Sequence, residues 1–161
     1  MDRSKAAVIT VSDSAFAGER EDVSGETAEQ LLRESGFAEV GRVTVPDERL
    51  AIEEALRLCV EDGFNLVITT GGTGLGPRDI TPEATRRVIE REAPGLAELM
   101  RAEGMRKTPM AALSRGIAGA VGSTLIVNLP GSTKAVAENL NAILPVLPHA
   151  LQTLRGDTQH D

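Results

Sequence analysis

The feature that most constrains this chain is a set of three short apolar runs rich in valine and isoleucine. They are Ala6 to Val11, Asn65 to Thr69 and Ser123 to Asn128. Continuous apolar runs of this length are typical of strands covered on both faces, as in a parallel sheet. A fourth run, Glu39 to Val45, alternates more between apolar and polar residues, so we expect it nearer an edge of the sheet.

Segments with the apolar spacing of helices separate these runs. They are Gly25 to Ser35, Glu48 to Glu61, Thr81 to Arg91 and Thr133 to Leu154. Strands that alternate with helices predict an α/β domain, in which right-handed crossovers place helices on both faces of a mostly parallel sheet.

Two local features refine this expectation. Pro145 and Pro148 cannot lie inside a helix without a lost hydrogen bond and a ring clash, so the last helical segment should break near Leu144. Residues 116–121 form another strand-like run, and Gly122 separates it from the run at 123–128. This pattern predicts a hairpin, and therefore a mixed sheet.

Composition limits the size of the fold and its partners. The chain has 161 residues, of which 41% are hydrophobic, and this suits a single domain over residues 1–161. The net charge is -7 and aromatic residues make up 2%, so the chain lacks the basic field and the stacking surfaces that nucleic acid needs. We expect no nucleic-acid partner, and any bound nucleotide should be held through its phosphates and ribose.

The single cysteine and the N-terminal residues favour a cytoplasmic protein. Cys59 lies in an apolar-periodic run, which predicts an inert core thiol and excludes an intramolecular disulfide. Residues 1–5 are short and polar, unlike a signal peptide, and no apolar run is long enough for a membrane span. His149 and His160, the only histidines, lack metal-ligand spacing, and we expect neither to be catalytic.

The strand at 65–69 leads into a loop that is dense in glycine, and ligands bind beyond such strand ends in open α/β sheets. The loop glycines are Gly71, Gly72, Gly74 and Gly76. They let the backbone approach a ligand and turn N–H groups toward an anion. Thr81 as N-cap and Pro82 as first helical residue would bring a phosphate near a helix N-terminus. The spacing matches neither common phosphate fingerprint, and a tight connection that needs positive φ angles is the alternative.

Two further turns follow strands at the same end of the predicted sheet. After residues 123–128, Ser132 could cap the next helix and Lys134 could reach a phosphate, although a plain turn with a cap would also explain this segment. After residues 6–11, Asp13 supplies a carboxylate between two serines and is a candidate substrate-binding residue, although alone it would be a turn residue. The segment 18–25 is acidic and should form a mobile, solvated loop.

Asp47 and Asp79 also fall at strand carboxyl ends. Transfer of a phosphoryl or nucleotidyl group requires Mg²⁺, which is usually held by one or two carboxylates together with substrate phosphates. We therefore expect Asp47 and Asp79 to converge as catalytic and metal-binding residues. A helix-capping role is the alternative for each, above all for Asp47, which precedes a helical run.

Five segments together resemble one known family. They are TVSDS at 10–14, VPDE at 45–48, TTGGTGLGPRDITPEA at 69–84, LSR at 113–115 and LPGSTKA at 129–135. They are similar to the molybdopterin adenylyltransferases and the related molybdopterin-binding proteins of molybdenum cofactor biosynthesis. The resemblance spans nearly the whole chain, and its most specific part is the block from 70 to 84.

The resemblance implies a three-layer α/β/α domain, usually a trimer or hexamer, that joins the terminal phosphate of molybdopterin to the AMP moiety of MgATP. Pyrophosphate is released, and the adenylylated product could pass to a molybdenum-inserting enzyme. Asp47 and Asp79 would contact Mg²⁺ and the nucleotide phosphates. The residues implied in substrate binding are Gly71, Gly72, Thr73, Gly74, Ser114, Pro130, Gly131, Ser132 and Lys134.

Two other functions remain open from the sequence. A non-catalytic protein that binds or carries molybdopterin would share these motifs. The segment 71–81 also resembles the nucleotide pyrophosphatase domain of competence-damage proteins, but Arg78 precedes a single acidic residue here, Asp79, and this ranks hydrolysis third.

Overall fold

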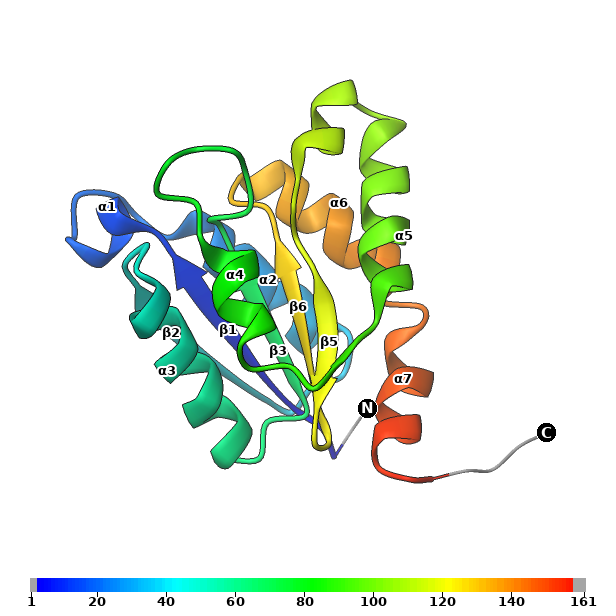
Figure 1. Cartoon of the computed structure of the whole chain (residues 1–161). Coiled ribbons are helices and arrows are strands. Elements are labelled where there is room, and N and C mark those ends of the chain that lie inside the picture. Colours follow the sequence, from blue (N-terminus) through cyan, green and yellow to red (C-terminus); the bar gives the residue numbers. More distant parts are fainter. Residues whose placement is uncertain (1–2, 158–161) are drawn as a thin grey trace.

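The computed structural model describes residues 3–157 and shows one mixed sheet between two layers of helices (Figure 1). The sheet has six strands in the order β2-β1-β3-β6-β5-β4. Their bounds are β1 Lys5–Val11, β2 Glu39–Val45, β3 Leu66–Thr70, β4 Arg91–Glu92, β5 Ala118–Val121 and β6 Thr124–Leu129. The three-layer α/β/α architecture expected from the sequence is confirmed.

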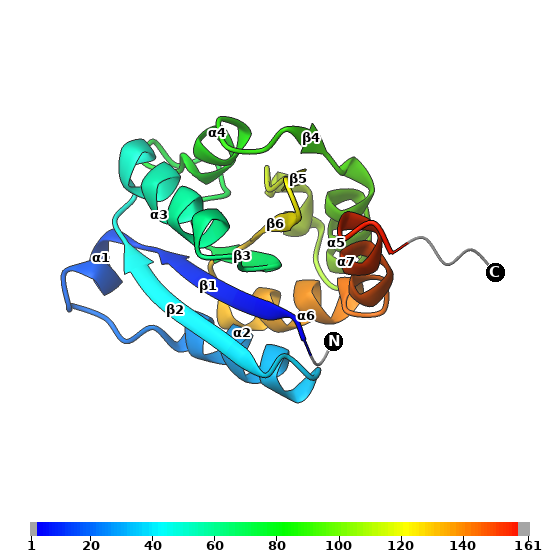
Figure 2. The same cartoon turned by 90° about the horizontal axis from the view of Figure 1, so that it is seen from below.

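The pairing of the strands is parallel at the centre and antiparallel at one side. β1 pairs in parallel with β2 and β3, and β3 pairs in parallel with β6. β5 and β6 form the expected antiparallel hairpin, in which Gly122 turns the chain with a φ of 56°. β2 lies at one edge of the sheet, as its alternating pattern predicted (Figure 2).

Helices cover both faces of the sheet (Figure 2). α2, α5, α6 and α7 pack against one face, and α3 and α4 pack against the other. Their bounds are α1 Asp13–Phe16, α2 Val23–Glu34, α3 Arg49–Glu61, α4 Thr81–Arg86, α5 Pro94–Met105, α6 Thr133–Ile143 and α7 Leu147–Leu154, with a 3-10 helix η1 at Pro109–Leu113.

Alternate residues of each central strand point into one of two apolar cores. In β1, Ala6 and Val8 pack with α2 and α6, whereas Ala7 and Ile9 pack with α3 and α4. β3 is buried along its whole length. This two-sided burial explains why the central strands read as continuous apolar runs.

Several parts of the secondary structure differ from the sequence-based expectation. The helix expected over 81–91 ends at Arg86, and Arg91–Glu92 instead pairs with β5 as β4. α1, α5 and η1 were not predicted. The acidic segment 18–25 was expected to be a loop, but α2 already begins at Val23, where the Asp22 side chain accepts a hydrogen bond from the Gly25 N–H. The break expected near Leu144 is confirmed, because α6 ends at Ile143 and α7 begins at Leu147.

The cysteine and the histidine of the described range lie at positions that can be compared with the sequence-based expectations. Cys59 is buried on α3, and burial raises its pKa to about 11, as expected for an inert thiol. His149 lies exposed on α7, and His160 lies outside the described residues. Over residues 3–157, no helix combines the length and apolar character that crossing a membrane would require.

Candidate functional site

The carboxyl ends of β1, β3 and β6 lie side by side in the sheet. Thr10 of β1 is in register with Thr70 of β3, and Thr70 is in register with Leu129 of β6. The turns that follow these strands therefore meet at one end of the sheet, where they surround two cavities. Their position agrees with the general location of ligand sites in open α/β sheets.

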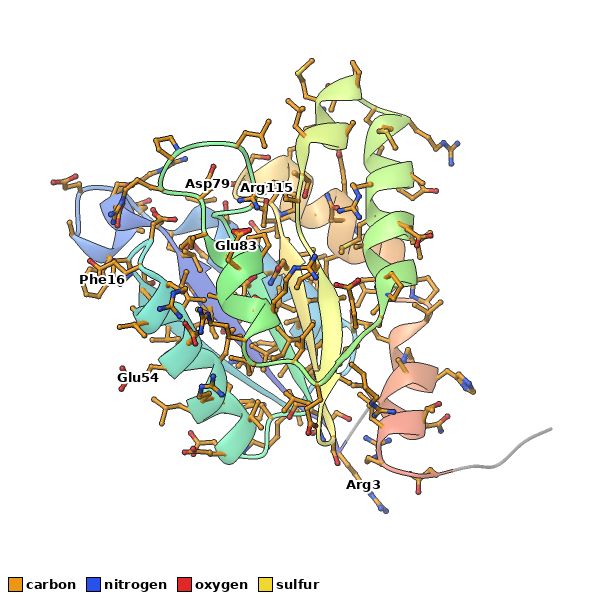
Figure 3. The ribbon with its side chains drawn as sticks, viewed as in Figure 1. Arg3, Phe16, Glu54, Asp79, Glu83 and Arg115 are labelled. Atoms are coloured by element: carbon orange, nitrogen blue, oxygen red, sulfur yellow. The ribbon has the colours of Figure 1, made fainter. Side chains whose placement is uncertain are left out.

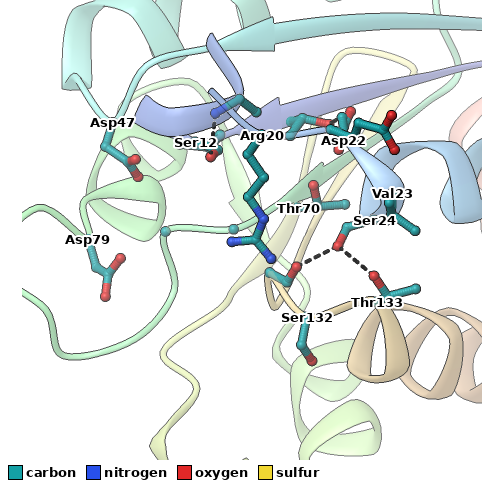
Figure 4. Close-up of a pocket in the computed structure, with 17 residues that line it drawn as sticks. Ser12, Arg20, Asp22, Val23, Ser24, Asp47, Thr70, Asp79, Ser132 and Thr133 are labelled. Atoms are coloured by element: carbon teal, nitrogen blue, oxygen red, sulfur yellow. Dashed lines mark hydrogen bonds between the residues drawn. The ribbon is translucent and has the colours of Figure 1, made fainter. Parts of the chain in front are cut away.

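The larger of these two cavities has a volume of about 550 Å³, and most of the residues that line it are polar (Figure 4). Asp47 and Asp79 form one side, and Ser24, Ser132 and Thr133 form the other. Gly71 and Gly72 also line the cavity. It thus combines carboxylates, hydroxyl groups and glycine backbone, which suits a ligand with several phosphate oxygens.

A second cavity of about 470 Å³ adjoins the first. Met100, Met110 and Leu113 contribute apolar surface to it, and polar residues include Ser114 and Asn139. The two cavities share four lining residues: Gly72, Asp79, Gly131 and Ser132. Ligands bound in the two cavities would therefore meet at these residues.

The glycine loop after β3 is held close to its neighbours by its own backbone conformation. Gly71 and Gly72 have φ values of 93° and 72°, which residues with a side chain rarely adopt. The Gly71 N–H donates to the Leu129 carbonyl oxygen at 3.1 Å, and the Thr81 hydroxyl donates to the Gly71 carbonyl oxygen at 2.9 Å. Thr81 was expected to be the N-cap of α4, but Ile80 occupies that position and the Thr81 side chain fastens the loop instead. The N-cap prediction was therefore wrong by one residue.

Arg115 fixes the outer part of the same loop. Its Nε donates to the Gly74 carbonyl oxygen at 2.7 Å, and its second amino group donates to the Asp79 carbonyl oxygen at 3.0 Å. A third contact pairs Arg115 with Glu83 at 2.6 Å (Figure 3), and this ion pair lowers the pKa of the Glu83 carboxyl. No role for Arg115 was predicted from the sequence, although it directly follows Ser114 in the LSR segment.

Asp47 sits in an environment that opposes its ionisation. Burial raises the pKa of its carboxyl, the backbone N–H of Asp13 lowers it by donating at 2.9 Å, and the negative charges of Asp13 and Asp79 raise it further. The net effect is a raised pKa. Helix capping does not explain Asp47, because Glu48 is the N-cap of α3 and the Asp47 side chain turns toward Asp13.

Asp79 bends back onto its own loop. One of its carboxylate oxygens accepts a hydrogen bond from the Gly76 N–H at 2.9 Å. Both Asp79 and Asp47 line the larger cavity, so the structure brings the two expected carboxylates to one cavity. This donor set fits Mg²⁺, which needs only one or two carboxylates when substrate phosphates complete its coordination. Within the part of the chain described, no group of three or more His, Cys, Asp or Glu side chains could hold a metal ion by itself.

The structure gathers most of the expected substrate-binding residues around the two cavities. Those that line one or both are Gly71, Gly72, Thr73, Gly74, Ser114, Pro130, Gly131 and Ser132. Asp13 and Lys134 line neither cavity. Arg78 engages the Asp13 carboxylate, and the Lys134 side chain is 84% exposed and lies 3.9 Å from Glu138. Ser132 caps α6 as expected, by accepting a hydrogen bond from the Ala135 N–H.

Residues 20–24, at the start of α2, contribute lining residues that were expected from the sequence to be solvated surface. Arg20, Asp22 and Ser24 all line the larger cavity. The Ser24 hydroxyl donates to the Gly131 carbonyl oxygen at 2.6 Å, which joins α2 to the turn after β6 (Figure 4). The sequence signal available was Asp22, a preferred N-cap residue, which marks the start of α2.

Comparisons with known proteins agree with this geometry. The family described as "Probable molybdopterin binding domain" matches residues 7–149. The chain is 42% identical to the molybdopterin adenylyltransferase of Helicobacter pylori strain J99, over 93% of this chain and 87% of that protein. It is 44% identical to the molybdenum cofactor synthesis protein cinnamon of Drosophila melanogaster, but it spans only 25% of the length of that protein.

A solved structure shows the same fold. The molybdopterin biosynthesis enzyme MoaB from Thermus thermophilus superposes with a TM-score of 0.90 at 53% sequence identity, over 95% of this chain and 97% of that one. The family match and the sequence similarity both extend over most of the chain. The chain therefore belongs to the molybdopterin-binding domain family of molybdenum cofactor biosynthesis.

Proposed function

We propose that this chain is a molybdopterin adenylyltransferase, which transfers AMP from ATP to the terminal phosphate of molybdopterin. The observation that carries the proposal is the pair of cavities that adjoin at Gly72, Asp79, Gly131 and Ser132. A transfer between two ligands requires their reacting ends to be held in contact. The polar cavity suits the nucleotide phosphates, and the cavity with Met100 and Met110 suits the pterin. The name of the Helicobacter pylori relative supports the same reaction.

In this reaction, an oxygen of the molybdopterin phosphate attacks the α-phosphorus of ATP. A new P–O bond forms while the bond between the α-phosphorus and the oxygen bridging to the β-phosphate breaks, and that oxygen leaves with pyrophosphate. Such transfers depend on positioning and charge stabilisation, so no nucleophilic side chain is needed.

The residues of the larger cavity have separate roles in this proposal. Gly71 and Gly72 let the nucleotide phosphates approach the backbone closely. Asp47 and Asp79 would hold Mg²⁺, which when bound neutralises charge on the phosphate oxygens. Ser132 and Gly131 lie where the two ligands would meet and would orient the accepting phosphate.

We further propose that the protein works in the cytoplasm as a homotrimer or hexamer and hands its product to a molybdenum-inserting enzyme. An apolar groove lined in part by Leu96, Val146 and Leu154 supports assembly, because a second copy could cover it. Sedimentation velocity at micromolar concentration tests this point. A single monomeric species would contradict it.

The reaction is tested by anaerobic incubation with molybdopterin and MgATP while pyrophosphate release is followed. The informative variant is Asp79→Asn, which keeps an oxygen for the Gly76 N–H but removes the negative charge. Asp62→Asn, at an exposed site after α3, is the matched control. We expect release only when molybdopterin is present, a loss of at least about 100-fold in Asp79→Asn, and wild-type activity in the control.

Two other results would identify the alternative functions. Binding of molybdopterin without pyrophosphate release would contradict adenylyl transfer and identify a binding or carrier protein. Pyrophosphate release from the nucleotide alone would identify a nucleotide pyrophosphatase.

A further inference from the structure

The short connection between α1 and α2 places an arginine side chain in the larger cavity. Figure 4 shows Arg20 extending into the cavity, with its guanidinium between Asp79 on one side and Ser24 on the other. The surrounding segment is acidic, and from the sequence it was expected to be a solvated surface. Arg20 instead lines the cavity.

The charges of the lining residues make this arginine important. Four carboxylates line the cavity, those of Glu21, Asp22, Asp47 and Asp79, and Arg20 is the only lysine or arginine among the lining residues. A polyphosphate would be repelled by these carboxylates unless cations offset them. Among the lining residues, Arg20 is the one that can offset this negative charge.

The guanidinium of Arg20 is available for a ligand. Arg42 and Arg78, which lie near the same end of the sheet, are both occupied: Arg42 pairs with Asp22 at 2.9 Å and Arg78 pairs with Asp13 at 3.0 Å. Arg20 forms no ion pair or side-chain hydrogen bond with any residue in the range 3–157. Its planar set of five N–H donors matches the oxygens of a phosphate group.

Hydrogen bonds on both sides anchor the connection that carries Arg20. On the α1 side, the Gly18 N–H donates to the Ala15 carbonyl oxygen and the Glu19 N–H donates to the Ser14 carbonyl oxygen. On the α2 side, the Asp22 carboxylate accepts from the Thr10 hydroxyl at 2.6 Å. Arg20 therefore projects from a short stretch fixed at both ends.

We propose that Arg20 binds the phosphates of the nucleotide that leave as pyrophosphate. The proposal rests on the adenylyl transfer proposed above and adds a residue to its nucleotide site. Charge-assisted, bidentate contacts make arginine effective for phosphate recognition. Because Arg20 lines only the larger cavity, its contact belongs to the nucleotide and not to the pterin.

Binding is measured directly by isothermal titration calorimetry, in which pyrophosphate is titrated into the whole protein with and without Mg²⁺. The variants are Arg20→Ala and Arg20→Lys, with Arg106→Ala as control, because Arg106 is an exposed arginine at the C-terminal end of α5 that lines neither cavity. We expect pyrophosphate affinity to fall about 10- to 100-fold in Arg20→Ala and less in Arg20→Lys. The control should bind as the wild type does.

Molybdopterin is titrated in parallel under anaerobic conditions, and its affinity should be unchanged in Arg20→Ala. A loss confined to molybdopterin would overturn the assignment to the nucleotide. Unchanged pyrophosphate affinity, or no pyrophosphate binding by the wild type, would overturn the proposal altogether.

Kinetics separate this proposal from the proposed function. In turnover assays, Arg20→Ala should raise the KM for MgATP more than it lowers kcat, because the contact that is lost is to the nucleotide. An effect on the position of the pterin would leave that KM unchanged. If the wild type binds pyrophosphate through Arg20 but never releases it from MgATP and molybdopterin, adenylyl transfer fails and the Arg20 contact stands. If the wild type turns over and Arg20→Ala equals it in affinity and KM, only the Arg20 proposal fails.

Discussion

Asp13 and Asp47 exchange hydrogen bonds, since each carboxylate accepts the backbone N–H of the other residue at 2.9 Å. This reciprocal pair joins the turn after β1 to the turn after β2. Arg78 completes the arrangement with two contacts to the Asp13 carboxylate, both at 3.0 Å, and these contacts lower the pKa of Asp13. Asp13 is thus occupied by protein groups, and its effect on the site passes through the position of Asp47.

Replacement of Asp13 should therefore weaken catalysis indirectly. Asp13→Asn keeps an oxygen for the Asp47 N–H, whereas Asp13→Ala removes it. We expect kcat/KM for pyrophosphate release to fall about tenfold in Asp13→Ala, equivalent to about 1.4 kcal/mol, and much less in Asp13→Asn. Equal losses in the two variants would show that the charge of Asp13 matters and that its hydrogen bond to Asp47 does not.

Gly72 is a loop position where a side chain would collide with its neighbours. A Cβ atom there would overlap the Thr81 hydroxyl and approach the Asp47 carboxylate to 3.3 Å, and the φ of 72° adds backbone strain. Gly18 has a similar φ of 77° but nothing within 4 Å of the corresponding Cβ. We expect Gly18→Ala to lower the free energy of unfolding by about 1–2 kcal/mol from strain alone. Gly72→Ala should lower it by more than about 3 kcal/mol.

Urea denaturation of both glycine variants measures this difference. Equal destabilisation would mean that the loop moves aside at Gly72 at little cost, and would contradict a rigid connection between Gly72 and Thr81.

The sequence predicted the parts of the fold whose signal is local. β1, β3 and β6 are covered on both faces, so their burial appears as continuous apolar residues, and Pro145 marks the break between α6 and α7. β4 has only two residues and exists because Arg91 and Glu92 pair with β5. A strand of two residues is too short to show a periodicity. The helix predicted over 81–91 was therefore extended past Arg86, where α4 ends.

In the site too, residues with a local sequence signal could be predicted, whereas roles that depend on contacts between distant parts of the sequence could not. The glycine loop and the carboxylates Asp47 and Asp79 could be predicted because strand ends converge in an open α/β sheet. Arg115 was missed because its function depends on contacts with Gly74, which is 41 positions away in the sequence. Lys134 was predicted from its charge and from the family resemblance, and its side chain on α6 is exposed to solvent.

Arg115 should contribute to stability as well as to the shape of the site. Arg115→Ala removes two hydrogen bonds to loop carbonyl groups and leaves Glu83 without its cation, although the arginine side chain is about one-third exposed. We expect a loss of about 1–3 kcal/mol in the free energy of unfolding, measured with urea. Arg106→Ala, which removes an exposed pair with Glu103, should cost less than about 0.5 kcal/mol. A similar cost for both variants would contradict the role of Arg115 in holding the loop.

Cys59 provides a test of the core beneath α3. Burial is the main cause that raises the pKa of its thiol to about 11, and the negative charge of Asp62 is a smaller cause. The side chain is packed in the core with Ile52 and Leu56. Only the thiolate reacts with an aromatic disulfide reagent, so at pH 8 the folded protein should react on the order of 100-fold more slowly than the chain in guanidinium. The raised pKa also means that this group's contribution to stability is complete below the pKa of the unfolded thiol. That contribution is lost as the pH rises through about 11. A native reaction rate close to the unfolded rate would show that α3 opens readily and that the core on this face of the sheet is not closed over Cys59.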